Sequence, residues 1–205
     1  NNYRTFGKIQ KVPYICFMRP QKVQDLEMLK GLMSVLRAKG YDGASLNDLA
    51  EAAGLKKASL YHRFPGGKKE MAAAVLNYVE EWIDQNIYRV LTDSELAADE
   101  RLRITLDNIR ALYDQGEAIC IFRSMSMETG MELFGQQIKA GLRQWIAAFT
   151  QLGVTLGFDP PTAEAKALQT LIDIQGSLVV AKGMNTTAIF ETTLQGIHKR
   201  YHPTN

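Results

Sequence analysis

The chain of 205 residues has only 2 cysteines, Cys16 and Cys120, and they lie far apart. A disulfide-stapled fold and a cysteine-rich metal site both need more cysteines at closer spacing, so both classes are excluded. Free thiols are therefore expected, with a redox role for Cys120 as the alternative.

Long apolar runs are missing as well. No run approaches the roughly 18 residues that a transmembrane helix needs. Residues 12–18 contain Pro13 and lack a small-residue cleavage site, so a signal peptide is not expected. We expect a cytoplasmic protein without a membrane partner. With 6 prolines, 16 glycines, 46% apolar residues and no strand pattern, the sequence predicts a folded, mainly helical chain.

Acidic residues are scarce near the N-terminus. Residues 1–69 hold 13 Lys and Arg against 5 Asp and Glu, a net charge of +8, whereas residues 70–205 carry −6. A basic end on a mildly acidic body is typical of a nucleic-acid-binding domain joined to a non-binding core. Residues 1–24 are basic throughout and form either a solvated tail or an arm that reaches DNA.

Residues 45–69 carry the most informative pattern, two short helices joined by a tight turn. Ser45 is a helix N-cap that pairs with Asp48 in a capping box, and Gly54 supplies the positive φ of the turn. The second helix ends before Pro65. Its apolar face leaves four side chains to point outward: Lys57, Tyr61, His62 and Arg63. A helix-turn-helix of this kind places its second helix in the DNA major groove.

Beyond this pattern, several short segments resemble the DNA-binding domain of the TetR family of bacterial repressors: Gly40-Tyr41, Ser45-Leu46, Leu49-Ala50, Ala53-Gly54-Leu55 and Ser59-Leu60-Tyr61-His62 before Phe64. The corner at residues 64–68 resembles the LmrA/YxaF-like branch. The resemblance implies DNA contacts at Ser45, Asn47, Lys57, Ser59, Tyr61, His62 and Lys68. Lys56 stands where the family often has a capping Ser, so the cap is either lost or replaced by water or a backbone contact, and Lys56 becomes a further phosphate-contact candidate.

The rest of the pattern predicts an all-α fold of about nine helices. The first spans residues 25–39, with a stripe of Leu26, Leu29, Met33 and Leu36, and ends at Gly40. A long helix follows over residues 68–91, and the next is capped by residues 92–94 and ends near Gly116. An irregular stretch broken by Gly130 then precedes a helix that ends at Gly157. Another helix runs from Asp159 toward Gly183, and a last helix follows. We expect an arm (1–24), a three-helix head (25–69) and a ligand-binding and dimerisation body (70–205).

Two apolar sets in the body suggest function. The first set is either ordinary core or the wall of a cavity for an apolar or aromatic inducer, and the resemblance favours the cavity. Its members are Tyr78, Tyr113, Phe122, Met125, Met131, Phe134 and Trp145. The second is the stripe of the last two helices, expected to form a homodimer as a four-helix bundle: Leu171, Gln175, Leu178, Phe190, Leu194, Ile197 and Tyr201.

Catalytic and metal sites are not expected. His198 and His202 have the i, i+4 spacing of helical metal ligands, but no carboxylate motif accompanies them, which favours exposed histidines. Residues 66–69 lack the strand that precedes a phosphate loop. No cofactor is predicted and an enzyme is disfavoured. The sequence predicts a transcriptional repressor that a small molecule releases from a palindromic operator; the alternative is a constitutive or architectural DNA-binding protein without an inducer.

Overall fold

The computed structural model describes residues 25–202, and every regular element in that range is a helix. In chain order these are α1 (Asp25–Gly43), α2 (Leu46–Ala52), α3 (Lys57–Arg63), α4 (Lys68–Ile83), the π-helical turn η1 (Asp84–Tyr88), α5 (Arg89–Thr92), α6 (Ala98–Leu112), the 3₁₀ turn η2 (Asp114–Gly116), α7 (Ile121–Met125), α8 (Glu128–Thr155), α9 (Pro160–Met184) and α10 (Ala188–Tyr201). The predicted all-α fold is confirmed. The predicted arm and Cys16 lie outside the described residues.

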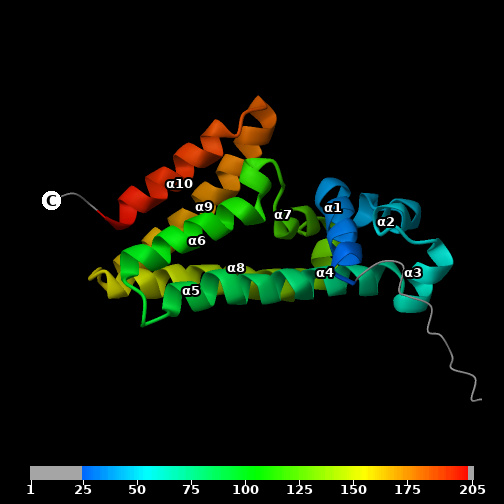
Figure 1. Ribbon diagram of the computed structural model, residues 1–205, viewed down its shortest axis with the longest axis horizontal. Coiled ribbons are helices and arrows are strands. Elements are labelled where there is room, and N and C mark those ends of the chain that lie inside the picture. The colour runs from blue at the N-terminus through cyan, green and yellow to red at the C-terminus, as the bar shows by residue number, and fades with distance from the viewer. Residues whose placement is uncertain (1–24, 203–205) are drawn as a thin grey trace, which may run out of the picture.

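Helix α1 and the short helices α2 and α3 form a head at one end of the molecule, and the others form the body (Figure 1). Helices α4, η1 and α5 form one continuous rod that runs from the head along α8, so that the described part contains nine helices when the rod is counted once. Helices α6, α9 and α10 cover the far part of the body, and the short α7 lies between α1 and the body (Figure 1). None of the described helices is long and apolar enough to cross a membrane.

Several helix ends lie where the capping residues predicted them. Gly40, with φ 68°, interrupts the helical geometry of α1 where the sequence predicts its end. Gly157, with φ 92°, follows α8. The Asp159 side chain accepts a hydrogen bond from the Thr162 amide at 3.1 Å, and Pro160 occupies the first helical position of α9.

Other boundaries differ from the prediction. Helix α6 begins at Ala98 because Asp93 caps a turn instead, accepting from the Glu95 amide at 2.9 Å. Helix α9 continues past Gly183 and ends on Asn185, which adopts the left-handed conformation with φ 51°. The predicted stripe of α1 is partly correct: Leu36 is buried and Leu29 and Met33 pack against the core, whereas Leu26 is 46% exposed. Met28 and Leu32, which were not predicted, are the other buried residues of this helix.

Gly130 lies inside α8 and does not break it. A Cβ atom there would lie 2.6 Å from the Met125 carbonyl oxygen and 3.3 Å from the Tyr41 Cβ, so glycine permits α8 to approach both α7 and α1. The Tyr41 and Phe134 rings meet edge to face at 5.8 Å beside this contact. The junction of head and body therefore depends on a close helix approach at the start of α8.

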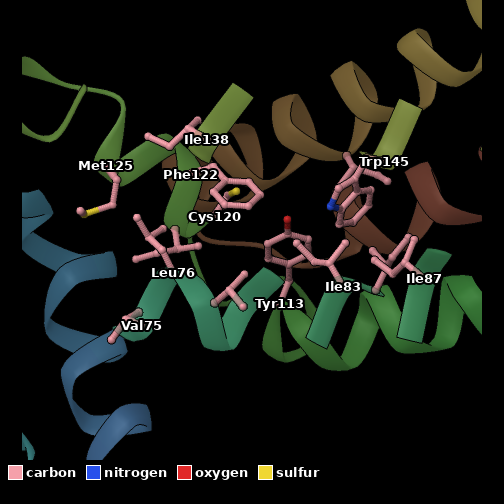
Figure 2. Packing of buried hydrophobic residues seen from close by; sticks show 14 of the residues in the cluster. Val75, Leu76, Ile83, Ile87, Tyr113, Cys120, Phe122, Met125, Ile138 and Trp145 are labelled. Atoms are coloured by element: carbon pink, nitrogen blue, oxygen red, sulfur yellow. The ribbon is translucent and has the colours of Figure 1, made fainter. Parts of the chain in front are cut away.

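One continuous apolar core extends from the head through the body. In its central part the ring of Tyr113 from the end of α6 packs among Ile83, Cys120 and Phe122 (Figure 2). Burial and the adjacent Cys120 thiol raise the pKa of Tyr113, and the Gln175 amide donates to its hydroxyl at 3.1 Å. Cys120 is itself buried, which separates its thiol from solvent.

Candidate nucleic-acid interface

The first helix of the motif is fixed by the predicted capping box. The Asp48 amide donates to Ser45 Oγ at 3.2 Å, and the Ser45 amide donates to the Asp48 carboxylate at 3.1 Å. Lys39 from α1 lies 2.8 Å from the same carboxylate. Hydrogen bonds from Lys39 and then from Ser45 lower the pKa of Asp48 to about 2. The box therefore both starts α2 and joins it to α1.

The turn and the recognition helix also have the predicted geometry. Gly54 adopts φ 64°, and the Leu55 amide donates to the Ala50 carbonyl at 3.0 Å, which closes the end of α2. Leu60 and Phe64 are buried on one side of α3. Lys56 precedes α3 without a side-chain hydrogen bond to its first turn, as expected for a residue that cannot accept one.

Most of the predicted DNA contacts are exposed at the head end of the molecule. They lie at the start of α2 and along α3, the helix that ends the head in Figure 1. These residues are Ser45, Asn47, Lys56, Lys57, Ser59, Tyr61 and His62. Lys69, in the first turn of α4, is exposed as well. The large apolar ring of Tyr61 is 43% exposed, an unusual position for an aromatic side chain with no partner ring among the described residues.

Two predicted DNA contacts are turned into the head instead. Arg63 does not point outward: its guanidinium lies 2.8 Å from the Asp25 carboxylate and 3.2 Å from Met28 Sδ, both on α1. The Lys68 ammonium donates to the Tyr41 and Ala44 carbonyls at 2.8 and 3.2 Å. These contacts hold α3 and α4 against α1, so both cations stabilise the packing of the head.

An acidic contact at the start of α4 was not predicted. The Gly66 amide donates to the Glu70 carboxylate at 2.7 Å, so an acid from the first turn already occupies this helix N-terminus. The spacing of Glu70 four residues after Gly66 was the available signal.

The predicted inducer residues fill the core. Tyr113, Phe122, Met125, Phe134 and Trp145 are buried, Tyr78 is half-buried and Met131 is 48% exposed. The space between Tyr113 and Phe122 has a volume of about 10 Å³, room for no more than one water molecule. The larger hollows lie elsewhere.

Two adjoining hollows open where α1 faces the body. The first has a volume of about 470 Å³ and lies between α1 and the segment after α6: Lys30, Met33, Ser34, Arg37, Ala38, Asp114, Glu117, Ala118, Ile119 and Lys182. The second, of about 270 Å³, shares Ile119 and Lys182 and extends along α9. Burial lowers the pKa of Arg37, and its Nε has no hydrogen-bond partner among the described residues.

The predicted dimer residues lie inside this chain. Phe190, Leu194, Ile197 and Tyr201 are at most 1% exposed, and Leu171 and Leu178 are buried as well. Gln175 binds Tyr113. The exposed apolar side chains of α9 lie on its other side: Leu168, Ile172, Val179, Val180 and Met184. The stripe expected to meet a partner is therefore buried within this chain, and α9 carries further apolar side chains that stay exposed.

Comparisons with known proteins agree with this architecture. Residues 29–75 match the model of "Bacterial regulatory proteins, tetR family". LmrA, an HTH-type transcriptional regulator of Bacillus subtilis, is 36% identical over 61 residues, which is 30% of this chain and 32% of LmrA. The uncharacterized HTH-type regulator YxaF of the same organism is 24% identical over 153 residues, covering 72% of this chain and 78% of YxaF.

Solved structures share the fold over most of the chain. A TetR transcriptional regulator from Legionella pneumophila superposes with a TM-score of 0.72 at 21% identity, covering 88% of this chain and 99% of that one. The TetR-family regulator CifR, solved with a 26-base-pair double-strand operator, gives a TM-score of 0.68 at 22% identity and covers 91% of this chain and 100% of that one.

Proposed function

We propose that this chain, a DNA-binding transcriptional regulator of the TetR type, represses its target genes as a homodimer and that a small molecule releases it from a palindromic operator. The observation that carries this proposal is the exposed face of α3, where Lys57, Ser59, Tyr61 and His62 project from a helix anchored by Leu60 and Phe64. The operator-bound state of CifR, which has the same fold, supports the proposal.

A division of roles follows from the contacts within the head. Lys57 and Ser59 start the recognition helix and are placed to meet base edges, while Ser45, Lys56 and Lys69 are exposed beside it and suit phosphates. Lys68 is reassigned from phosphate contact to support of the head, because two backbone carbonyls and the Tyr41 ring, 4.5 Å away, already engage its ammonium. Acting on DNA, the protein would work in the cytoplasm.

For dimerisation we propose the outer face of α9 and α10. Leu168, Ile172 and Val179 expose apolar side chains there. Gly176 on α9 and Gly196 on α10 line one shallow groove, and a Cβ atom at either position would meet nothing within 4 Å in this chain. Glycine in an exposed helix interior costs about 1 kcal/mol relative to alanine, and close approach of a partner helix would offset that cost.

For the inducer we propose the two hollows between α1 and the body, in place of the filled core. One wall comes from the head (Met33, Arg37) and the other from the body (Glu117, Ile119), so a ligand there touches both parts. Apolar Met33 and Ile119 and the cationic Lys30 and Arg37 all line the first hollow, which favours a ligand that combines an apolar body with a hydrogen-bond acceptor. A ligand that prefers one head orientation would shift the spacing of the two recognition helices and lower operator affinity by its differential binding.

Selection of genomic fragments that bind the purified protein would test the regulatory proposal. We expect enrichment of a palindrome upstream of a gene, and higher expression of a reporter behind that palindrome when α3 carries Lys57→Ala and Tyr61→Ala. Two results would overturn repression at a specific operator: selected fragments that share no common sequence, or reporter expression that falls in the Lys57→Ala, Tyr61→Ala variant.

A second experiment separates a ligand-released repressor from a constitutive one. The constitutive alternative is kept because the predicted inducer residues fill the core. Compounds that raise the melting temperature should also lower operator affinity, and Ile119→Trp, which fills the wall shared by both hollows, should abolish both effects. Leu133→Trp, at an exposed site on α8, is the matched control. A compound that still acts on Ile119→Trp binds elsewhere, and a protein that no compound releases is constitutive.

A further inference from the structure

Two histidines and one aspartate from distant parts of the chain converge at the far end of the body. His198 and His202 lie one turn apart at the end of α10, with ring centroids 5.0 Å apart. Asp99, in the first turn of α6, places its Oδ1 3.1 Å from His198 Nε2 and 3.0 Å from His202 Nε2. The carboxylate that the local sequence lacks is therefore supplied by α6, a contact that the spacing within α10 could not show.

Hydrogen bonding accounts for only part of this arrangement. His198 Nε2 is hydrogen-bonded to Asp99. His202 Nε2 is as close to the same oxygen, yet it makes no hydrogen bond with it. This atom is buried and has no hydrogen-bond partner among the described residues. A nitrogen buried without a partner, beside a second nitrogen and a carboxylate oxygen, is an arrangement that a cation would satisfy.

We propose that Asp99, His198 and His202 form a binding site for a divalent transition-metal ion. One candidate donor atom from each of the three lies within 4.8 Å of the other two. Ligands about 2.0–2.1 Å from a tetrahedral zinc ion lie roughly 3.3 Å from one another, close to the two nitrogen–oxygen distances here. Small side-chain rotations would bring all three atoms onto one ion.

The donor set selects the class of metal. Two imidazoles and one carboxylate suit Zn²⁺ and its neighbours Co²⁺, Ni²⁺ and Cu²⁺, whereas Mg²⁺ and Ca²⁺ prefer oxygen ligands alone. Three protein ligands leave a coordination position open, and the side chains of Asp99 and His198 are 63% and 42% exposed, so water reaches the site. The ion would link the start of α6 to the end of α10.

The test uses the full chain without an affinity tag, stripped of metal and titrated with Co²⁺ and Zn²⁺. We expect one Co²⁺ per chain with a visible absorption band, and its displacement by Zn²⁺. Asp99→Asn, His198→Gln and His202→Gln should each weaken binding by more than about tenfold, the loss that even an outer-shell partner causes. His62→Gln removes the remaining histidine of the chain, on α3, and should leave the affinity for Co²⁺ and Zn²⁺ unchanged.

Nuclear magnetic resonance of the histidine side chains locates the ion independently of any variant's stability. Added Ni²⁺ should broaden the imidazole signals of His198 and His202 before those of His62. Three results would overturn the proposal: no binding by the wild-type chain at millimolar metal, undiminished binding by the His198→Gln, His202→Gln double variant, or broadening of His62 alone.

Discussion

Lys57 and Lys68 lie in the same motif, and the structure gives them opposite surroundings. Lys57 is exposed at the start of α3, whereas the Lys68 ammonium binds the Tyr41 and Ala44 carbonyls that follow the break in α1. Carbonyls at a helix end need such donors because they have no partner within the helix. The two lysines should therefore have separable effects on stability and on DNA recognition.

Lys68→Met keeps the side-chain length and removes the ammonium. It should lower the free energy of unfolding by about 1–3 kcal/mol, since hydrogen bonds from a charged group are lost. Lys57→Ala should leave stability unchanged and alter preference at one base pair by about 1–3 kcal/mol. Urea unfolding and binding to a fragment library measure the two quantities. If Lys68→Met were as stable as wild type and bound all fragments equally weakly, Lys68 would be a phosphate contact.

Asp48 should make the head sensitive to acid. Its folded pKa, about 2, lies below the ordinary 3.8, so its stabilising contribution is complete above 3.8 and disappears as the pH falls from 3.8 to about 2. Asp48→Asn should therefore show a smaller loss of stability over that range than wild type. Unfolding followed by circular dichroism at each pH gives the comparison, and parallel curves for the two proteins would refute this role.

Among the helices, the ends that local residues fix were predictable and those fixed by tertiary contacts were not. Gly40, Asp159 and Pro160 act through their own backbone or a neighbour three residues away, which the sequence displays. Gly130 acts through a contact with the Met125 carbonyl across a helix–helix approach, and spacing alone made it look like a break. Asp99 meets His198 only because α6 and α10 pack together.

Gly130→Ala should destabilise the protein by about 1–3 kcal/mol, because its Cβ would overlap the Met125 carbonyl and force α8 away. Gly135→Ala is the matched change in the same helix. Its Cβ would meet only the flexible Met131 side chain at 3.4 Å, so it should gain up to about 1 kcal/mol from helix propensity. Thermal unfolding of both variants decides the point; equal effects would mean that the close approach is unimportant.

For the whole molecule, the sequence shows that α9 and α10 are apolar, but it does not show which side of α9 is buried within the chain and which stays exposed. An inward and an outward apolar stripe on α9 have the same helical period, and only packing against α8 and α10 shows that Leu171 and Leu178 face inward while Ile172 and Val179 face out. The sequence could not separate core from inducer cavity for a related reason, since aromatic and methionine side chains serve equally well as core and as cavity wall.

Ile172→Glu places a charge at the centre of the outer α9 face and should yield a folded monomer. Leu133→Glu makes the same change at an exposed site on the head-proximal part of α8 and should remain dimeric. Light scattering coupled to gel filtration measures the mass. A dimeric Ile172→Glu protein would place the interface on another surface.

The central claim, that the exposed face of α3 recognises a specific duplex, is tested most directly by fluorescence anisotropy with the selected palindrome and a scrambled duplex of equal length. We predict saturable binding to the palindrome, with affinity falling about a thousandfold between 50 and 200 mM salt if some six phosphates are contacted. The scrambled duplex should bind far more weakly throughout. Equal affinity for both duplexes at low salt would contradict the account.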